Sequence, residues 1–291
     1  MDELMAALVD EVEDVDEETF HVFFQNHSST QDLGMLDPRA EEVELAINGR
    51  DFTIKQSPGV LQSKREGGTT GAAVWRACLV FAEWLAWAKN PLFSSDLLTS
   101  ESVTLELGSG ISGVVPLIAS PRVGRVVATD QQYALKLLQE NITNNLPAAR
   151  PKSPKGHTKQ QHAPPSNIDV LALDWETSDI PAFLSTQGLR DGVDAVLMCD
   201  CIYNYALIKP LVQTCVEICR ARSTRQSNID EKSKPTICLI AQQLRQPDVF
   251  EQWLQAFMAS LRVWRVPDGM LTNGLKEGSG YVVHVGLLRD K

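Results

Sequence analysis

The feature that most constrains the fold is a glycine-rich turn between a short apolar strand and a helix. Residues 103–107 (VTLEL) have the composition of a buried strand, and a helix is expected over about 112–119. Between them, Gly108, Gly110 and Gly113 form a complete G-x-G-x-x-G. Glycines here permit a tight turn and let a ligand approach the backbone, while the helix N–H groups face that ligand. The sequence therefore predicts a ligand-binding unit of strand, turn and helix.

The rest of the chain repeats this alternation of strands and helices. We expect strands at 103–107, 125–129, 168–173, 194–199, 236–242, 261–266 and 280–288, and helices at 72–89, 112–119, 131–145, 206–222 and 247–259. Such alternation implies right-handed crossovers and a largely parallel sheet with helices on both faces. The last two strands, with no evident helix between them, are expected to form an antiparallel hairpin at one edge. The predicted fold class is α/β, with a Rossmann-like seven-stranded sheet.

The domain boundaries follow from the segments before this sheet. Apolar and polar residues alternate over 41–62 around Asn48-Gly49, which predicts a hairpin. Residues 1–40 form an acidic leader that we expect to be flexible, and the folded domain is predicted to span 41–291. Two stretches without apolar residues to bury are interpreted as disordered insertions in that domain, near 147–166 and 223–235.

The negative charge of the chain is concentrated in the leader. The net charge is −10, yet residues 1–38 contain eleven Asp and Glu and no Lys or Arg, so the remainder is close to neutral. We interpret the leader as a solvated tail, with docking of a basic protein partner as the alternative. No basic stripe indicates a direct interaction with nucleic acid.

The sequence indicates a soluble intracellular protein. No apolar run approaches the roughly 18–20 residues that span a bilayer, and the acidic start of the chain is unlike the basic start of a signal peptide. We expect a cytoplasmic monomer with no membrane contact. The six cysteines include no C-x-x-C pair and lie in apolar stretches, so buried thiols are expected, with neither disulfides nor a metal site.

An acidic residue follows the glycine turn at the spacing typical of a nucleoside site. Asp130 ends the strand at 125–129, twenty residues after Gly110, where a carboxylate can accept both hydroxyls of an adenosine ribose. Sites for NAD and for S-adenosylmethionine share this arrangement. The choice is tilted towards S-adenosylmethionine by Glu106, which could fix the glycine loop or the amino group of a methionine tail, and by the sequence Asp200-Cys201-Ile202-Tyr203 after a later strand.

Five motifs occur in a fixed order: Gly71–Trp75 (G-x-x-V-W), VTLELGSGISG, ATD, LDW and CDCIY. Together they resemble the seven-strand protein-lysine methyltransferases of methyltransferase family sixteen, among which the fungal ribosomal lysine methyltransferase type is nearest. The resemblance covers about residues 45–288 and leaves out the acidic leader. It implies a methyltransferase domain over 41–291 with S-adenosylmethionine as its cofactor.

The resemblance also implies which residues contact the cofactor. Trp75 would line the pocket near the methionine part, and the backbone of Gly108, Ser109 and Gly110 would pass beneath it. Asp130 would hold the ribose hydroxyls.

The adenine would be covered by Trp175, with Asp174 beside it, and Cys199 would contact the cofactor through its backbone. Many relatives have Ala or Gly in place of Cys199. Taken singly, Trp75 and Trp175 are more often core aromatics, but Trp175 directly follows a strand, at the carboxyl end where open α/β sheets bind ligands. The other tryptophans are assigned to packing: Trp84, Trp87, Trp253 and Trp264.

The catalytic residues implied by the resemblance are Asp200 and Tyr203. Their spacing of three would bring both side chains to a common side of one turn of chain. Asp200 would orient the lysine ammonium and Tyr203 would shape the lysine channel. Because a carboxylate favours a charged ammonium, recognition is expected to come first and proton removal, to water or through Asp200, second. Asp200 could instead cap the helix at 206–222, but Asn204 is equally well placed for that.

The main hypothesis is a protein-lysine N-methyltransferase that uses S-adenosylmethionine and acts on a large-subunit ribosomal protein. The same chemistry on an elongation factor or a chaperone is the second interpretation. A nicotinamide-dependent dehydrogenase is disfavoured by Glu106 and by the motif at 200–203. A non-catalytic binding module with the same fold is disfavoured by the intact glycine turn, Asp130, Asp200 and Tyr203.

Overall fold

The computed structural model describes residues 8, 11–25, 34–63, 69–147, 166–226 and 234–289. The predicted insertion near 147–166 lies outside the described residues except at its two ends. Of the one predicted near 223–235, residues 227–233 lie outside them, whereas 223–226 continue a helix, so the start of that insertion was placed too early. Within these segments, no helix is long and apolar enough to cross a membrane.

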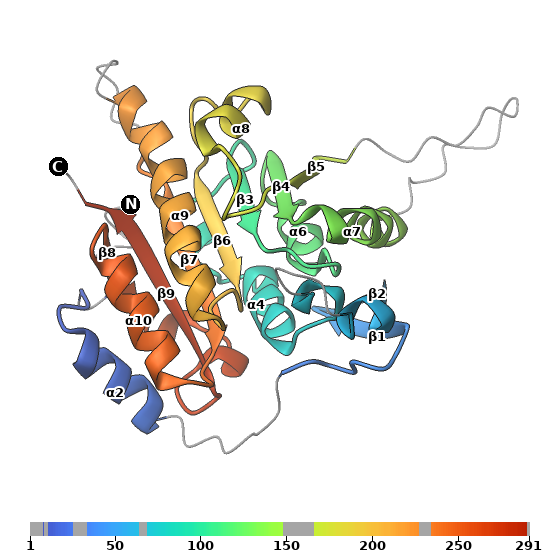
Figure 1. The fold of residues 1–291 in the computed structure, drawn as a ribbon, viewed down its shortest axis with the longest axis horizontal. Coiled ribbons are helices and arrows are strands. Elements are labelled where there is room, and N and C mark those ends of the chain that lie inside the picture. Colours follow the sequence, from blue (N-terminus) through green and yellow to red (C-terminus); the bar gives the residue numbers. More distant parts are fainter. Residues whose placement is uncertain are drawn as a thin grey trace, which may run out of the picture.

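A seven-stranded sheet forms the centre of the molecule, with the strand order β5-β4-β3-β6-β7-β9-β8 (Figure 1). The first five strands are parallel, and β9 runs antiparallel to both of its neighbours. The strands are β3 (Val103–Leu107), β4 (Arg125–Asp130), β5 (Ile168–Ala172), β6 (Ala195–Cys199), β7 (Ile237–Gln243), β8 (Leu261–Arg265) and β9 (Tyr281–Leu288). The predicted fold class, including the antiparallel C-terminal hairpin, is confirmed.

The central strands are apolar on both faces because both faces are covered. β6 (AVLMC) is buried at every position and β7 at all but its last, as expected for parallel strands between two helix layers. Helices α4 (Arg76–Ala86), α6 (Val114–Ala119) and α7 (Gln132–Asn145) share one apolar cluster with one face of the sheet. Helices α8 (Ile180–Thr186), α9 (Tyr205–Gln226) and α10 (Pro247–Met258) share the cluster on the other face.

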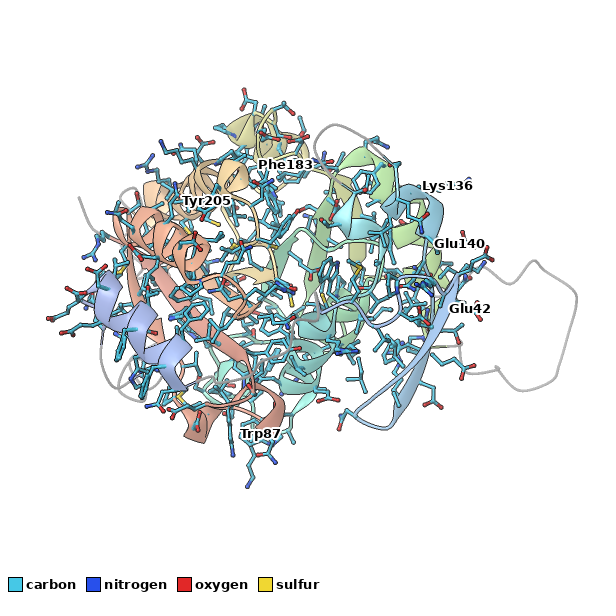
Figure 2. The ribbon with its side chains drawn as sticks, turned by 60° about the horizontal axis from the view of Figure 1, so that its bottom comes forward. Glu42, Trp87, Lys136, Glu140, Phe183 and Tyr205 are labelled. Atoms are coloured by element: carbon cyan, nitrogen blue, oxygen red, sulfur yellow. The ribbon has the colours of Figure 1, made fainter. Side chains whose placement is uncertain are left out.

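The predicted hairpin is present as β1 (Glu42–Ile47) and β2 (Arg50–Lys55). Asn48 and Gly49 connect the two strands with φ of 48° and 74°, the left-handed conformation of a tight two-residue turn. The hairpin packs beside α7, where Lys55 Nζ lies 2.5 Å from Glu140 Oε1. Figure 2 shows Glu140 and Glu42 together at this edge of the molecule.

The helix predicted over 72–89 is shorter in the structure. A 3₁₀ turn, η1 (Thr70–Ala72), precedes it, and α4 begins only at Arg76. Trp75 is extended, with φ of −102° and ψ of 138°, and it bridges to Met35. This pairing with an earlier segment removes Trp75 from the helix and turns it towards the site described below.

Short elements at chain reversals did not show a periodic pattern in the sequence. They are α3 (Pro58–Leu61), α5 (Pro91–Ser94), α8, η2 (Asp268–Met270) and η3 (Asn273–Leu275). Proline occupies the first or second helical position in α3, α5 and α8, where its missing N–H costs nothing.

The expectation of a flexible leader is wrong for residues 11–25. The Val12 N–H donates to Val263 O over 2.7 Å, and helix α2 (Val15–Gln25) packs against α10 (Figure 1). Val22 is 2% exposed, and Glu18 Oε1 lies 2.9 Å from Nε2 of the buried His284. The buried side chains of α2 are Glu18, Thr19 and Val22, which share one face of the helix. Its exposed carboxylates carry the acidity that suggested a solvated tail.

Candidate active site

A cavity of ≈ 510 Å³ opens at the carboxyl ends of the central strands. It is lined by all nine residues predicted from the sequence: Trp75, Gly108, Ser109, Gly110, Asp130, Trp175, Cys199, Asp200 and Tyr203. Asp174 lines it as well. The structure therefore brings the predicted cofactor residues and the predicted catalytic residues into one site.

The glycine turn presents its backbone to this cavity. Gly108 and Gly110 have φ of +73° and +60°, where a side chain would be strained. A Cβ at Gly108 would lie 3.1 Å from the Trp175 ring, and one at Gly110 would lie 3.2 Å from Gly71 O. The Ile111 N–H also donates to Gly71 O over 2.9 Å. Three chain segments thus meet at the turn at a distance that only glycine permits.

Glu106 holds the glycine turn in place through a hydrogen bond from Ser109. The Ser109 hydroxyl donates to Glu106 Oε2 over 2.5 Å, so one of the two roles expected for this carboxyl is observed. Burial raises the pKa of Glu106 to about 8, the hydrogen bond from Ser109 acts to lower it, and the charge of Asp130 raises it further. Glu106 is therefore mostly protonated at neutral pH and adds little negative charge to the cavity.

Asp130 ends β4 beside the same turn. The Gly110 N–H donates to its Oδ2 over 2.8 Å and the Gln131 N–H to its Oδ1 over 2.7 Å. Burial raises the pKa of Asp130 to about 6, the two backbone hydrogen bonds act to lower it, and Asp174 raises it. Each carboxylate oxygen keeps a further acceptor position, so Asp130 can bind a diol while the backbone holds it in place.

The two predicted tryptophans approach the cavity from different elements. Trp75 precedes α4, and its Nε1–H donates to Thr70 O over 2.9 Å. Trp175 follows β5 and packs across Gly108. By contrast, three other tryptophans are buried away from the cavity, as expected for packing residues: Trp84, Trp253 and Trp264.

Cys199 ends β6 at the cavity and is 4% exposed. Burial raises the pKa of its thiol well above the ordinary value, so the side chain is neutral. All six cysteines are buried and free, as predicted. Across the described part of the chain, no group of three or more His, Cys, Asp or Glu is arranged to hold a metal ion.

The surroundings of Asp200 differ from those predicted, because its carboxylate is already paired with an arginine. Asp200 has a φ of +57°, an uncommon backbone conformation that tends to occur at functional sites. Both oxygens of its carboxylate are bonded by Arg245, with Nη1–Oδ1 at 2.8 Å and Nη2–Oδ2 at 2.5 Å. The Gln243 N–H lies 3.3 Å from Oδ1. The carboxylate thus already has a cationic partner, which sequence reasoning missed.

Tyr203 lies in the connection between β6 and α9 and not on a helical turn. Residues 201–204 are outside any helix and α9 begins at Tyr205, so the expected common turn with Asp200 is not formed. The Tyr203 hydroxyl pairs with Thr70 Oγ1 at 3.0 Å. Asn204 Oδ1 accepts the Ala206 N–H over 3.0 Å, so Asn204 provides the helix cap and Asp200 is free of that role.

Several cavity residues were not predicted, because the sequence patterns that point to them are weak. Gln243 ends β7 and Arg245 follows it, and Ala241 of the same strand pairs with Cys199 of β6. A cation just after the neighbouring strand could have been linked to Asp200 if that pairing had been used. Phe23 of α2 and Met35 also line the cavity, but no local pattern connects them to the glycine turn.

The chain is similar in sequence to known lysine methyltransferases. A family model described as lysine methyltransferase matches residues 55–234, more than half of the chain. A ribosomal lysine N-methyltransferase 5 of Zygosaccharomyces rouxii is 31% identical over 229 residues, covering 70% of this chain and 70% of that protein. A protein of the same name in Candida glabrata is 28% identical, covering 70% of this chain and 68% of that protein.

A relative with a different name matches a larger part of this chain. A Schizosaccharomyces pombe protein named diaminohydroxyphosphoribosylamino-pyrimidine deaminase is 32% identical over 247 residues, covering 84% of this chain, which spans only 51% of that protein. This chain contains neither H-x-E nor C-x-x-C, the signature of zinc deaminases. The similarity to that protein therefore does not include the deaminase signature.

Among solved structures, a TehB-like SAM-dependent methyltransferase from Corynebacterium glutamicum is similar at 11% identity and a TM-score of 0.44, over 70% of this chain and 88% of that one. The family assignment follows from the family model and the fungal relatives: the chain belongs to the lysine methyltransferase family.

Proposed function

We propose that this protein transfers a methyl group from S-adenosylmethionine to a lysine of a large-subunit ribosomal protein. The observation that carries the proposal is the single cavity in which the glycine turn and Asp130 meet Asp200 and Tyr203. The names of the fungal relatives support the choice of a ribosomal substrate.

The residues present fit the cofactor of this family. A volume of ≈ 510 Å³ lies within the usual range for small-molecule sites, about 300–1,000 Å³. Asp130 has acceptor positions left for two ribose hydroxyls, and the backbone of Gly108 and Gly110 can approach a ligand because no side chain intervenes. Trp175 would face the adenine, and Trp75 and Cys199 would line the remaining length.

The protein's part in the reaction is positioning. S-adenosylmethionine supplies an already activated methyl group when bound, so the chain must align a lysine nitrogen with it and let that nitrogen lose a proton. A lysine amine with an ordinary pKa near 10.4 is almost wholly protonated at neutral pH. In the proposed reaction Asp200 orients the nitrogen, and the half-exposed ring of Tyr203 forms the wall of the lysine channel.

Calorimetry with S-adenosylmethionine and with NAD tests the cofactor, using Asp130→Ala as the control variant. Binding of S-adenosylmethionine alone, weakened by Asp130→Ala, is expected. Binding of NAD, or of neither, would contradict the proposal.

Transfer of labelled methyl groups tests the substrate. Purified large ribosomal subunits, elongation factors and chaperones from cells lacking the protein are offered in parallel, with Asp200→Ala as the inactive control. We expect label in a large-subunit protein. Label in a factor or chaperone would move the proposal to that substrate, while cofactor binding without any transfer would support a binding module. The cytoplasmic location and the monomeric state stay predictions.

A further inference from the structure

The Asp200–Arg245 pair lies in the wall of the cavity, with Asp200 buried and Arg245 partly buried. The Asp200 side chain is 3% exposed and the Arg245 side chain 19%. The guanidinium bonds both carboxylate oxygens, the fork geometry that gives the strongest pairs of this kind. Such a pair largely cancels the charge that Asp200 would otherwise present to a ligand.

Arg245 is held in this position by several other groups. Its Nη2 donates to Gln243 Oε1 over 2.8 Å, and its guanidinium carbon lies 5.4 Å from the centroid of the Trp75 ring. A Cβ at Gly34 would come within 2.8 Å of Nη2, so the chain leaves room for Arg245 at that point. Arg245 is therefore held by Gln243 at the end of β7 and by Trp75, and it packs close to the backbone at Gly34.

The pairing matters because a bare carboxylate would oppose catalysis. An opposite charge within about 4–6 Å stabilises the charged form of an ionisable group by one to three pKa units. Asp200 without a partner would therefore hold an incoming lysine as its ammonium, which has no free electron pair. A carboxylate whose charge is balanced by Arg245 can accept a hydrogen bond from the neutral amine without stabilising the ammonium form as strongly as an unpaired carboxylate would.

We propose that Arg245 is a positioning residue that neutralises Asp200, so that this carboxylate orients the lysine nitrogen without favouring its ammonium form. The inference rests on the proposed function. Its rival is that the lysine ammonium displaces Arg245 and takes its place on Asp200.

The surroundings of the pair contain other groups that can titrate or carry charge. Those that interact with Asp200 or Arg245 are Tyr203, Tyr281, Cys199 and Cys201, and the charge of Arg76 acts on Tyr281. Burial raises the pKa of both tyrosines and both cysteines, so these four stay neutral near pH 7. Arg245 is the cation that hydrogen-bonds Asp200, and substitution there changes the charge of the pair directly.

Proton release on binding of sinefungin tests the inference without turnover. Sinefungin is the analogue of S-adenosylmethionine that carries an amine where the methyl group is transferred, and S-adenosylhomocysteine lacks that amine. The full-length protein is titrated with each near neutral pH in two buffers of different ionisation enthalpy. The difference between the proton counts for the two ligands gives the protons released by the amine of sinefungin. The ratio of their Kd values cancels any effect of a substitution on the parts that the two ligands share.

We expect the natural protein to release about one more proton with sinefungin, because the amine is charged in solution and binds neutral. Arg245→Gln should abolish this release and improve sinefungin affinity relative to S-adenosylhomocysteine by about tenfold or more. Arg245→Lys keeps the positive charge and should keep the release.

An ammonium bound by the natural protein without proton release would overturn the inference in favour of displacement. An unchanged ligand ratio and proton count in Arg245→Gln would overturn it as well. If Arg245→Gln binds neither ligand, the proton count of the natural protein decides alone. Failure of the natural protein to bind S-adenosylhomocysteine would instead overturn the proposed function, and this inference with it.

Discussion

The buried pair between Glu18 and His284 should contribute measurably to stability. Glu18 Oε1 lies 2.9 Å from Nε2 of His284, which is 0% exposed, and 3.4 Å from Arg265 Nε. Nδ1 of His284 has no partner among the described residues. Replacing the carboxylate therefore weakens or removes the one hydrogen bond observed for this buried ring.

Glu18→Gln should lower the free energy of unfolding by about 2 kcal/mol, since a buried polar group left poorly paired costs roughly 1–3 kcal/mol. For a domain of this size each kcal/mol lowers the melting temperature by about 2–4 °C, so a decrease of about 4–8 °C is expected. Urea unfolding and thermal melts of the full chain measure both quantities. Glu17→Gln, at an exposed position of the same helix, removes the same charge and should change little.

The pH dependence supplies an independent check. Although burial opposes ionisation of Glu18, the hydrogen bond and charge of His284 and the charge of Arg265 hold its pKa below the ordinary value of 4.5. A lowered pKa contributes stability that is present above pH 4.5 and is lost as the pH falls through the folded-state pKa. The difference between the natural protein and Glu18→Gln should therefore shrink below pH 4.5. Equal effects of Glu17→Gln and Glu18→Gln at pH 7 would refute the reasoning.

Three further outcomes follow from the cavity. Asp130→Asn should weaken S-adenosylhomocysteine binding by about 10- to 100-fold, the worth of a hydrogen bond to a charged group. Because the pKa of Asp130 is raised to about 6, binding by the natural protein should also weaken below pH 6 in calorimetric titrations. An affinity that does not change with pH would contradict this. Gly110→Ala, at φ of +60° and 3.2 Å from Gly71 O, should cost roughly 1–3 kcal/mol through backbone strain, seen as a lower melting temperature, whereas Gly59→Ala, with open space around it, should not. Tyr203→Phe removes the contact with Thr70 and should slow labelled-methyl transfer a few-fold, which corresponds to about 1 kcal/mol. The affinity for S-adenosylhomocysteine should stay within twofold of the natural protein, and a large change in it would place the hydroxyl in the cofactor site instead.

The sheet could be predicted because its strands are defined locally. Val103–Leu107 was predicted to the residue, and the other six strands within one residue at each end. Each is a short apolar run bounded by polar or glycine residues, and the turn at Asn48-Gly49 determined the first hairpin in the same way.

The docking of α2 could not be predicted because its partners lie at the other end of the sequence. Val12 pairs with Val263, and Glu18 with His284, 266 residues later. Locally the segment is dominated by carboxylates, which are typical of a solvated tail. Only the assembled sheet with α10 packed on it provides the surface on which Val22 is buried.

Every residue predicted for the candidate site lies in the cavity, but Arg245 and its contact with Asp200 were not predicted. The residues that line the cavity follow strands whose order is fixed by topology, so their convergence follows from the fold. The bond between Asp200 and Arg245 joins residues 45 positions apart, and predicting it requires knowing that β6 and β7 are neighbours and how each connection turns.

The contact between α2 and the last two strands also has a consequence for the order of events during synthesis. Residues 11–25 leave the ribosome long before β8 and β9 exist, so their acidic helix has no surface to cover until translation of the domain is almost complete. Phe23 of that helix also lines the cavity. The nascent chain therefore completes the wall of its own cavity only after β8 and β9 have been made, when α2 meets these strands.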